Sequence, residues 1–139
     1  MGPPSSGALT LGQIFGMLEP HDLAALGPSN PESWRLIGEA SRLAFADRGR
    51  YMADVDFVAM PKGLLNKDYL KDRSRLFSNE VKTLAPEAVQ PGNPPSDHTH
   101  LFADDHSLEL PSTSHFSIVD KDGNTVSMTT TIENGIGLR

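Results

Sequence analysis

The first part of the chain repeats apolar residues at the spacing of an α-helix. Leu11, Ile14 and Leu18 lie three and four positions apart. This spacing predicts an amphipathic helix that ends near Pro20. A short helical turn over residues 23–26 follows, so the chain is expected to begin with helices.

A longer helix is predicted next, with a clear start signal. Asn30 can cap it, and Pro31 suits its first position. Glu32 complements the helix dipole in the first turn. The helix should run to about Arg50, and a further one is expected over residues 67–77. The apolar stripe of the long helix consists of Trp34, Ile37, Ala40, Leu43 and Ala44.

Between residues 85 and 112 the composition changes. Proline and aspartate recur there, and such a stretch cannot sustain a helix or a central strand. We therefore expect a long, mobile linker over residues 85–112. It would separate a helical part, residues 1–84, from a strand-bearing part, residues 113–139.

After this linker the apolar and polar residues alternate with a period of two. The alternation predicts one strand from residue 113 and a second one over residues 125–133. The fold class is therefore α+β, with a helical first half and a β-hairpin at the C-terminal end. Because the final residues run off a strand-like segment, we expect the chain to be a piece of something larger.

The turn between the two strands predicts their register. Residues 120–124 suit a three-residue loop in which Gly123 adopts the left-handed conformation. Thr113 then falls opposite Thr131 and projects from the same face, and Glu133 follows two residues later. A two-residue loop would shift the register by one and turn these side chains apart.

A hydroxyl at this position needs a base beside it to become a good nucleophile. Cleavage of the peptide bond between Ser112 and Thr113 would supply one, because a free α-amine has a pKa of about 7.7 to 8.0. Thr113 would then hold nucleophile and base in one residue. Without its sequence context, Thr113 would be an ordinary strand threonine.

The context of Thr113 is specific. The run Thr-Ser-His-Phe-Ser-Ile-Val-Asp-Lys-Asp-Gly-Asn, residues 113–124, resembles the start of the small subunit of gamma-glutamyltransferases, also called glutathione hydrolases. Upstream, the Pro-Pro-Ser-Ser-Gly loop at residues 3–7 and the run from Glu39 to Phe57 resemble the C-terminal part of the large subunit. Ser114 stands where many members have a second threonine. The resemblance covers nearly the whole chain in the family's order.

This resemblance implies an αββα sandwich of the N-terminal-nucleophile hydrolases and a proenzyme that cleaves itself between Ser112 and Thr113. Thr113 would be the catalytic nucleophile and Thr131 the second catalytic threonine. Glu133 would bind the α-amino group of the substrate. The implied partners are the two subunits of a heterodimer, and the family's bacterial members are commonly periplasmic or secreted.

The implied reaction begins with glutathione or another gamma-glutamyl amide, whose acyl group passes to Thr113. Water, an amino acid or a dipeptide then accepts the glutamyl group. No metal or organic cofactor is implied. The family's carboxylate-binding arginine and its oxyanion hole should lie outside this chain, so the chain alone is expected to be inactive.

Composition excludes several classes of function. The formal net charge is −6, whereas phosphate binding needs a surplus of clustered Lys and Arg, which argues against a nucleic-acid partner. No apolar run approaches the ~20 residues of a membrane span. Cysteine is absent, which excludes disulfides and thiolate metal sites.

Some alternatives stay open. The linker contains a group of possible metal ligands, Asp97, His98, His100, Asp104, Asp105 and His106. A proline-rich segment gives them no fixed geometry, so a metal site is not favoured. His115 near Ser117 invites a Ser-His interpretation, but two neighbouring strand residues do not make a triad. A related self-cleaving acylase and a non-catalytic homologue with a binding or structural role are the remaining hypotheses.

Overall fold

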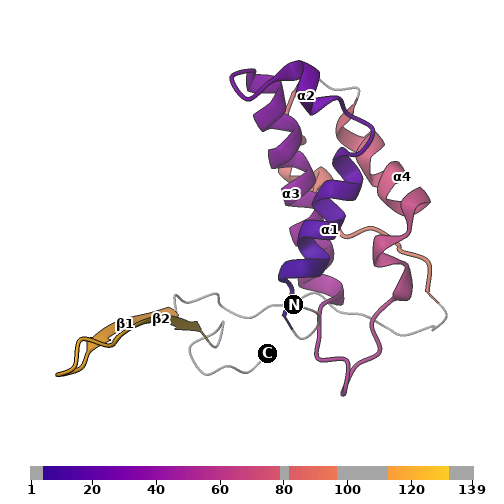
Figure 1. The fold of residues 1–139 in the computed structure, drawn as a ribbon. Helices are drawn as coiled ribbons and strands as arrows, with labels where there is room; N and C mark the ends of the chain where they lie inside the picture. The colour runs from indigo at the N-terminus through magenta and orange to yellow at the C-terminus, as the bar shows by residue number, and fades with distance from the viewer. Residues whose placement is uncertain (1–4, 79–81, 97–112, 132–139) are drawn as a thin grey trace. The chain divides into compact units, whose positions relative to one another are not determined.

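A computed structural model of the chain describes residues 5–78, 82–96 and 113–131. The chain divides into two compact units, Met1–Asp104 and Asp105–Arg139. The first contains the helices and the second a two-stranded antiparallel sheet (Figure 1). The predicted α+β content and the order of helices before strands are confirmed.

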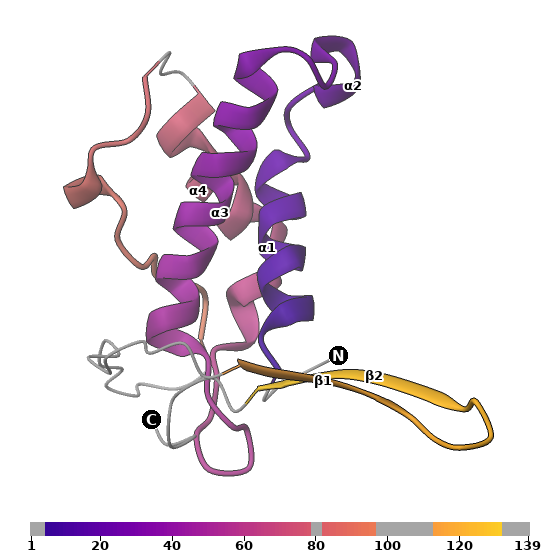
Figure 2. The same ribbon diagram turned by 90° about the vertical axis from the view of Figure 1, so that its left-hand side faces the viewer.

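The helical unit is built from three long helices and shorter turns. Its elements are α1 (Gly7–Leu18), α2 (Leu23–Leu26), α3 (Pro31–Tyr51), the 3-10 turn η1 (Lys62–Leu65), α4 (Lys67–Ser78) and the 3-10 turn η2 (Pro86–Ala88). Helices α1, α3 and α4 contact one another (Figures 1 and 2). Helix α3 starts as predicted, because the Asn30 side chain accepts a hydrogen bond from the Glu32 amide at 2.9 Å.

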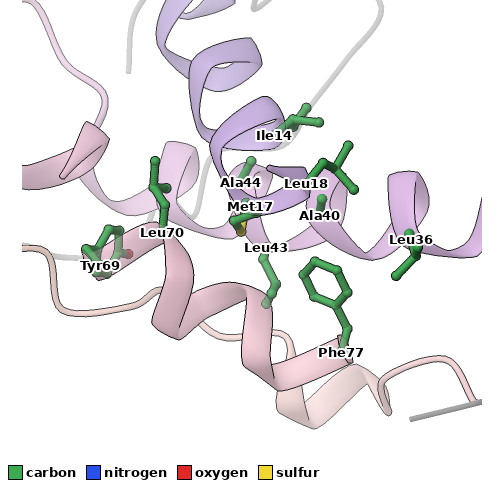
Figure 3. Close-up of a cluster of buried hydrophobic side chains, with 10 residues drawn as sticks. All are labelled: Ile14, Met17, Leu18, Leu36, Ala40, Leu43, Ala44, Tyr69, Leu70 and Phe77. Atoms are coloured by element: carbon green, nitrogen blue, oxygen red, sulfur yellow. The ribbon is translucent and has the colours of Figure 1, made fainter. Parts of the chain in front are cut away.

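The core lies where these three helices meet (Figure 3). Its buried hydrophobic members are Ile14, Met17, Leu18, Leu36, Ala40, Leu43, Ala44, Tyr69, Leu70 and Phe77. Ala40, Leu43 and Phe77 have no exposed surface at all. Ala40, Leu43 and Ala44 of the predicted α3 stripe are therefore buried against α1 and α4, which stabilises all three helices together.

One member of the predicted stripe does not reach this core. Trp34 remains 64% exposed, and Leu36, only 3% exposed, takes the buried position instead. The Trp34 indole lies on the outside of α3, where its Nε1–H donates to the carbonyl of Pro28 at 2.8 Å. The apolar spacing placed Trp34 in the stripe, but the buried position in this turn of α3 belongs to Leu36.

A buried carboxylate connects the helices. Asp47 of α3 is 1% exposed and forms an ion pair with Arg73 of α4, whose Nη2 lies 3.1 Å from Oδ1. The Tyr69 hydroxyl donates to Oδ2 at 2.5 Å, and Gln13 Nε2 of α1 donates to the same oxygen at 2.9 Å. Burial, with this hydrogen bond to Asp47, raises the pKa of Tyr69, so the phenol keeps its proton.

The fourth donor to Asp47 comes from the segment after α4. The Gly92 amide donates to Oδ1 at 2.8 Å, and the Gly92 carbonyl accepts from the Tyr51 hydroxyl. A Cβ at Gly92 would collide with the Tyr69 hydroxyl, so glycine permits this close approach. Further along, the carbonyl of Pro95 accepts from the Gly63 amide at 3.0 Å.

The same segment is held at its beginning. The Leu84 amide donates to Glu39 Oε1 at 3.2 Å, and the Leu84 carbonyl accepts from Arg42 at 2.9 Å. Residues 84–95 are therefore a strap bonded to α3 and to Gly63 of η1. The sequence predicted a linker here and did not indicate these hydrogen bonds. The assignment of residues 1–84, 85–112 and 113–139 to subunits and linker stays a prediction.

We expect Asp47→Asn to lower the free energy of unfolding of the helical unit by about 3 kcal/mol. The variant leaves the buried Arg73 guanidinium without its counter-charge. It also places an amide N–H₂, itself a donor, against groups that donate hydrogen bonds to Asp47. Urea unfolding of the chain, followed by far-ultraviolet circular dichroism, measures the loss.

The matched control is Asp72→Asn. Asp72 also pairs with an arginine, Arg75, but both side chains are about two-thirds exposed. Its loss should cost less than about 1 kcal/mol. Equal unfolding midpoints for Asp47→Asn and Asp72→Asn would contradict the role given to Asp47.

Candidate active site

The second unit is a β-hairpin with the predicted register. Strand β1 (Thr113–Val119) pairs with strand β2 (Thr125–Thr131) in antiparallel orientation. Thr113 lies directly opposite Thr131. Since opposite residues project to the same face, the hairpin brings these two predicted site residues together.

The loop of the hairpin sets this register. Gly123 has a φ of 84°, the left-handed conformation expected for it. The Asp120 amide donates to the carbonyl of Asn124 at 3.0 Å, and the Gly123 amide donates to the carbonyl of Asp120 at 3.2 Å. These bonds define the bulged three-residue loop.

The Asp120 carboxylate supports the loop from inside. It accepts hydrogen bonds from the backbone amides of Asp122 and Asn124, both at 2.9 Å, and from the Asn124 side chain at 2.8 Å. The side-chain bond from Asn124, followed by these backbone bonds, lowers the pKa of Asp120. The contribution of this carboxylate to stability is thus present above its usual pKa and is lost as the pH falls through the lowered value.

The register also fixes the type of pair that the two threonines form. Hydrogen-bonded and non-hydrogen-bonded pairs alternate along an antiparallel ladder. Asp120 and Asn124 form a hydrogen-bonded pair, and Thr113 lies seven residues from Asp120. Thr113 and Thr131 are therefore a non-hydrogen-bonded pair, the type in which side chains come closest. In such a pair the backbone N–H of Thr113 points away from β2.

Hydroxyl groups cover the face that carries Thr113. From its Thr113 end this face carries three polar pairs, Thr113 with Thr131, His115 with Thr129 and Ser117 with Ser127, and then Val119 with Thr125. His115 Nδ1 lies 2.8 Å from Thr129 Oγ1, and its Nε2 lies 3.3 Å from both serine Oγ atoms, those of Ser117 and Ser127. A catalytic triad with Ser117 was not favoured from the sequence, and these contacts of His115 were not predicted. The cross-strand register, which pairs His115 with Thr129, could have revealed them.

Several predicted features lie outside the described residues. These are Ser112, Glu133 and the possible metal ligands at 97–106. Within the described ranges, no group of three or more His, Cys, Asp or Glu could hold a metal ion. No helix within those ranges is both long and apolar enough to cross a membrane.

Comparison with known proteins assigns the family. A family model described as Gamma-glutamyltranspeptidase matches residues 1–138. The chain belongs to this family. The resemblance inferred from the residues around Thr113 and from Glu39 to Phe57 is thereby confirmed.

Individual relatives agree with this assignment. The glutathione hydrolase proenzyme of Bacillus subtilis subsp. natto is 35% identical over 142 residues, which cover 97% of this chain and 24% of that protein. The Acylase ACY 1 proenzyme of Pseudomonas sp. (strain V22) is 33% identical over 135 residues, with 96% of this chain and 21% of that protein covered. The chain therefore spans about a fifth to a quarter of the length of these curated relatives.

A solved structure has a similar backbone fold over most of this chain. The crystal structure of Helicobacter pylori gamma-glutamyltranspeptidase matches with a TM-score of 0.60 and 39% sequence identity. The match covers 72% of this chain and 28% of that one. The chain therefore shares its fold with part of a gamma-glutamyltranspeptidase.

We predict that Gly123→Val will destabilise the hairpin by about 1 to 2 kcal/mol, because a β-branched residue is strained at positive φ. Gly123→Asn is the matched control, since asparagine tolerates this conformation. Thermal unfolding of the full-length gene product, with hydrogen exchange of β1 and β2, measures both. Equal protection of the strands in the two variants would contradict this account of the register.

Proposed function

We propose that the full-length gene product cleaves itself between Ser112 and Thr113 and then transfers or hydrolyses gamma-glutamyl groups through an acyl-enzyme on Thr113. The observation that carries this proposal is the pairing of Thr113 with Thr131 at a non-hydrogen-bonded position of the hairpin. Family membership supplies the class of reaction.

The first step makes the nucleophile. Thr113 Oγ attacks the carbonyl carbon of Ser112, the hydroxyl proton passes to the Thr113 nitrogen, and the bond from that carbon to the nitrogen breaks. Water then hydrolyses the resulting ester, which leaves a carboxylate on Ser112 and a free amine on Thr113. Because the Thr113 N–H points away from β2, this cleavage removes no hydrogen bond from the ladder.

The second threonine supports the first. Cβ atoms of directly opposite strand residues lie about 4.5 to 5.5 Å apart, which brings their hydroxyl groups within hydrogen-bond reach of each other. Thr131 can then orient Thr113 Oγ in one rotamer while the new amine accepts its proton. The next two pairs on this face, His115 with Thr129 and Ser117 with Ser127, are also polar.

Catalysis then proceeds in two steps. Thr113 Oγ attacks the gamma-glutamyl carbonyl of glutathione or a similar amide, and the amine leaves after taking a proton. Water hydrolyses the ester, or an amino acid or dipeptide attacks it and accepts the glutamyl group. Thr113 supplies nucleophile and base, so the proposal assigns no step to a metal or an organic cofactor.

The opposite face of the hairpin supports an αββα sandwich. It carries Phe116, Ile118, Val126 and Met128, which are 38 to 58% exposed within the described residues. A two-stranded hairpin is only marginally stable in water without a partner for its apolar face. We propose that further strands and a helix layer of the full-length protein cover this face, and that the large and small subunits stay associated after cleavage.

Glu133 is proposed to determine the donor. It follows Thr131 by two residues, so a continued strand would place it on the same face as Thr113. A carboxylate there would pair with the α-amino group of a gamma-glutamyl donor.

A related acylase is the second candidate function. Its support is the similarity to an Acylase ACY 1 proenzyme, which is 33% identical and nearly as well covered as the glutathione hydrolases. An acylase would use the same Thr113 nucleophile, but its donor would need no α-amino group. The donor is therefore the property that separates the two candidates.

We expect Thr113→Ala to block cleavage of the full-length gene product, because no hydroxyl remains to attack Ser112. Thr131→Ala should still cleave, at least about tenfold more slowly, because it loses a hydrogen bond to the nucleophile. Denaturing gels of purified protein, sampled over time, give both rates. The matched control is Thr130→Ala, whose side chain projects from the other face; a loss as large as that of Thr131→Ala would contradict the assignment.

Glu133→Ala should raise the KM for gamma-glutamyl donors at least about tenfold, because an ion pair to the α-amino group is lost. Its KM for the same donor with the α-amino group replaced by hydrogen should stay unchanged. Steady-state kinetics with both donors measures the difference. An equal effect on the two donors would favour the acylase.

A further inference from the structure

We propose that His115 is a positioning residue for the nucleophile, because its bond to Thr129 holds the two strands at the spacing that the Thr113–Thr131 pair requires. This inference deepens the proposed function and rests on it. His115 would touch neither the substrate nor the reacting atoms.

The imidazole ring of His115 is bonded on both sides. Its Nδ1 lies 2.8 Å from Thr129 Oγ1 across the strands. Its Nε2 lies 3.3 Å from the Oγ atoms of Ser117 and Ser127, and these two hydroxyls lie 3.2 Å from each other. The contact to Thr129 is the shortest of the four, and Ser117 and Ser127 can bond each other without the ring. The Nδ1 bond is therefore the one that depends on histidine.

The contact between His115 and Thr129 can affect Thr113 because of its position in the ladder. His115 and Thr129 form the pair on the Thr113 face that is next to Thr113 and Thr131. By the same alternation it is a non-hydrogen-bonded pair, so no backbone bond joins the strands there. Side-chain contacts across the strands then contribute to their separation at this point. A nucleophile misplaced by about 1 Å can lose about 10²-fold in rate, so this separation matters for Thr113.

Two substitutions distinguish the ring nitrogens. Asparagine places a polar atom near the position of Nδ1, whereas glutamine places one near the position of Nε2. If the bond to Thr129 is what matters, His115→Asn should retain function and His115→Gln should not. Both variants remove the imidazole, so a merely structural role of the ring would affect them equally.

The test measures the first-order rate constant of self-cleavage in the full-length gene product, from the intact mass of freshly purified protein over time. His115→Ala and His115→Gln should each cleave about tenfold more slowly, the effect of one lost hydrogen bond, and His115→Asn should stay within about twofold of the unmodified protein. After cleavage, kcat for a gamma-glutamyl donor should fall in His115→Ala and His115→Gln but not in His115→Asn. KM should stay unchanged in all three variants. Ser117→Ala is the matched control and should cleave normally.

Substitutions of Thr129, the hydrogen-bond partner of His115, test the proposal if a His115 variant fails to fold. Thr129→Val should be as slow as His115→Ala, and Thr129→Ser should cleave normally. The double variant of His115→Ala and Thr129→Val should be no slower than either single one, because both remove the same bond.

The outcomes separate this inference from the proposed function. If the unmodified protein cleaves and His115→Ala cleaves at the same rate, the positioning role is overturned and the function of Thr113 stands. Equal rates for His115→Asn and His115→Gln would also overturn it. If the unmodified protein stays uncleaved when folded, both proposals are overturned.

Discussion

The buried carboxylate of Asp47 is the interaction on which the helical unit depends. It accepts four hydrogen bonds, from Gln13, Tyr69, Arg73 and the Gly92 amide, so that α1, α3, α4 and the strap share one acceptor. Burying a charge is costly unless it is paired and hydrogen-bonded. Here each oxygen has two donors, so the carboxylate is stable only when all four parts are in place. This requirement favours one arrangement of the helices over others of similar hydrophobic burial.

The strap links this network to the rest of the chain. Residues 84–95 are bonded to Glu39, Asp47, Tyr51 and Gly63, so the strap is held on the helical unit as far as Pro95. Ser112, on the N-terminal side of the proposed cleavage point, lies 17 residues after Pro95 (112 − 95). The bonds of the strap involve residues on the N-terminal side of that point. Cleavage there would therefore leave the strap attached to the helices.

The hairpin relies on a different constraint, the positive φ of Gly123. The bulged loop sets the register, and the register makes Thr113 and Thr131 a non-hydrogen-bonded pair. The same alternation places His115 opposite Thr129 and turns Phe116, Ile118, Val126 and Met128 to the other face. One local conformation thus determines both the polar face and the apolar face of the sheet.

Features that depend on local sequence could be predicted, and features that depend on distant partners could not. The Asn30 cap and the register set by Gly123 follow from residues within a few positions of each other, and both were confirmed. The role of Asp47 was missed because its partners lie 22 to 45 residues away. The strap was missed for the same reason, since a proline-rich composition does not show which backbone groups find acceptors. Trp34 was misplaced because hydrophobicity does not show which face of α3 meets α1 and α4.

The central claim is that Thr113 becomes the first residue of a separate chain and acts as the nucleophile. The most direct test is the intact mass of the unmodified full-length gene product after purification and incubation. The account predicts two chains, one of which has the mass of a polypeptide that begins at Thr113. A single uncleaved chain in folded protein, or a cut at another bond, would contradict it.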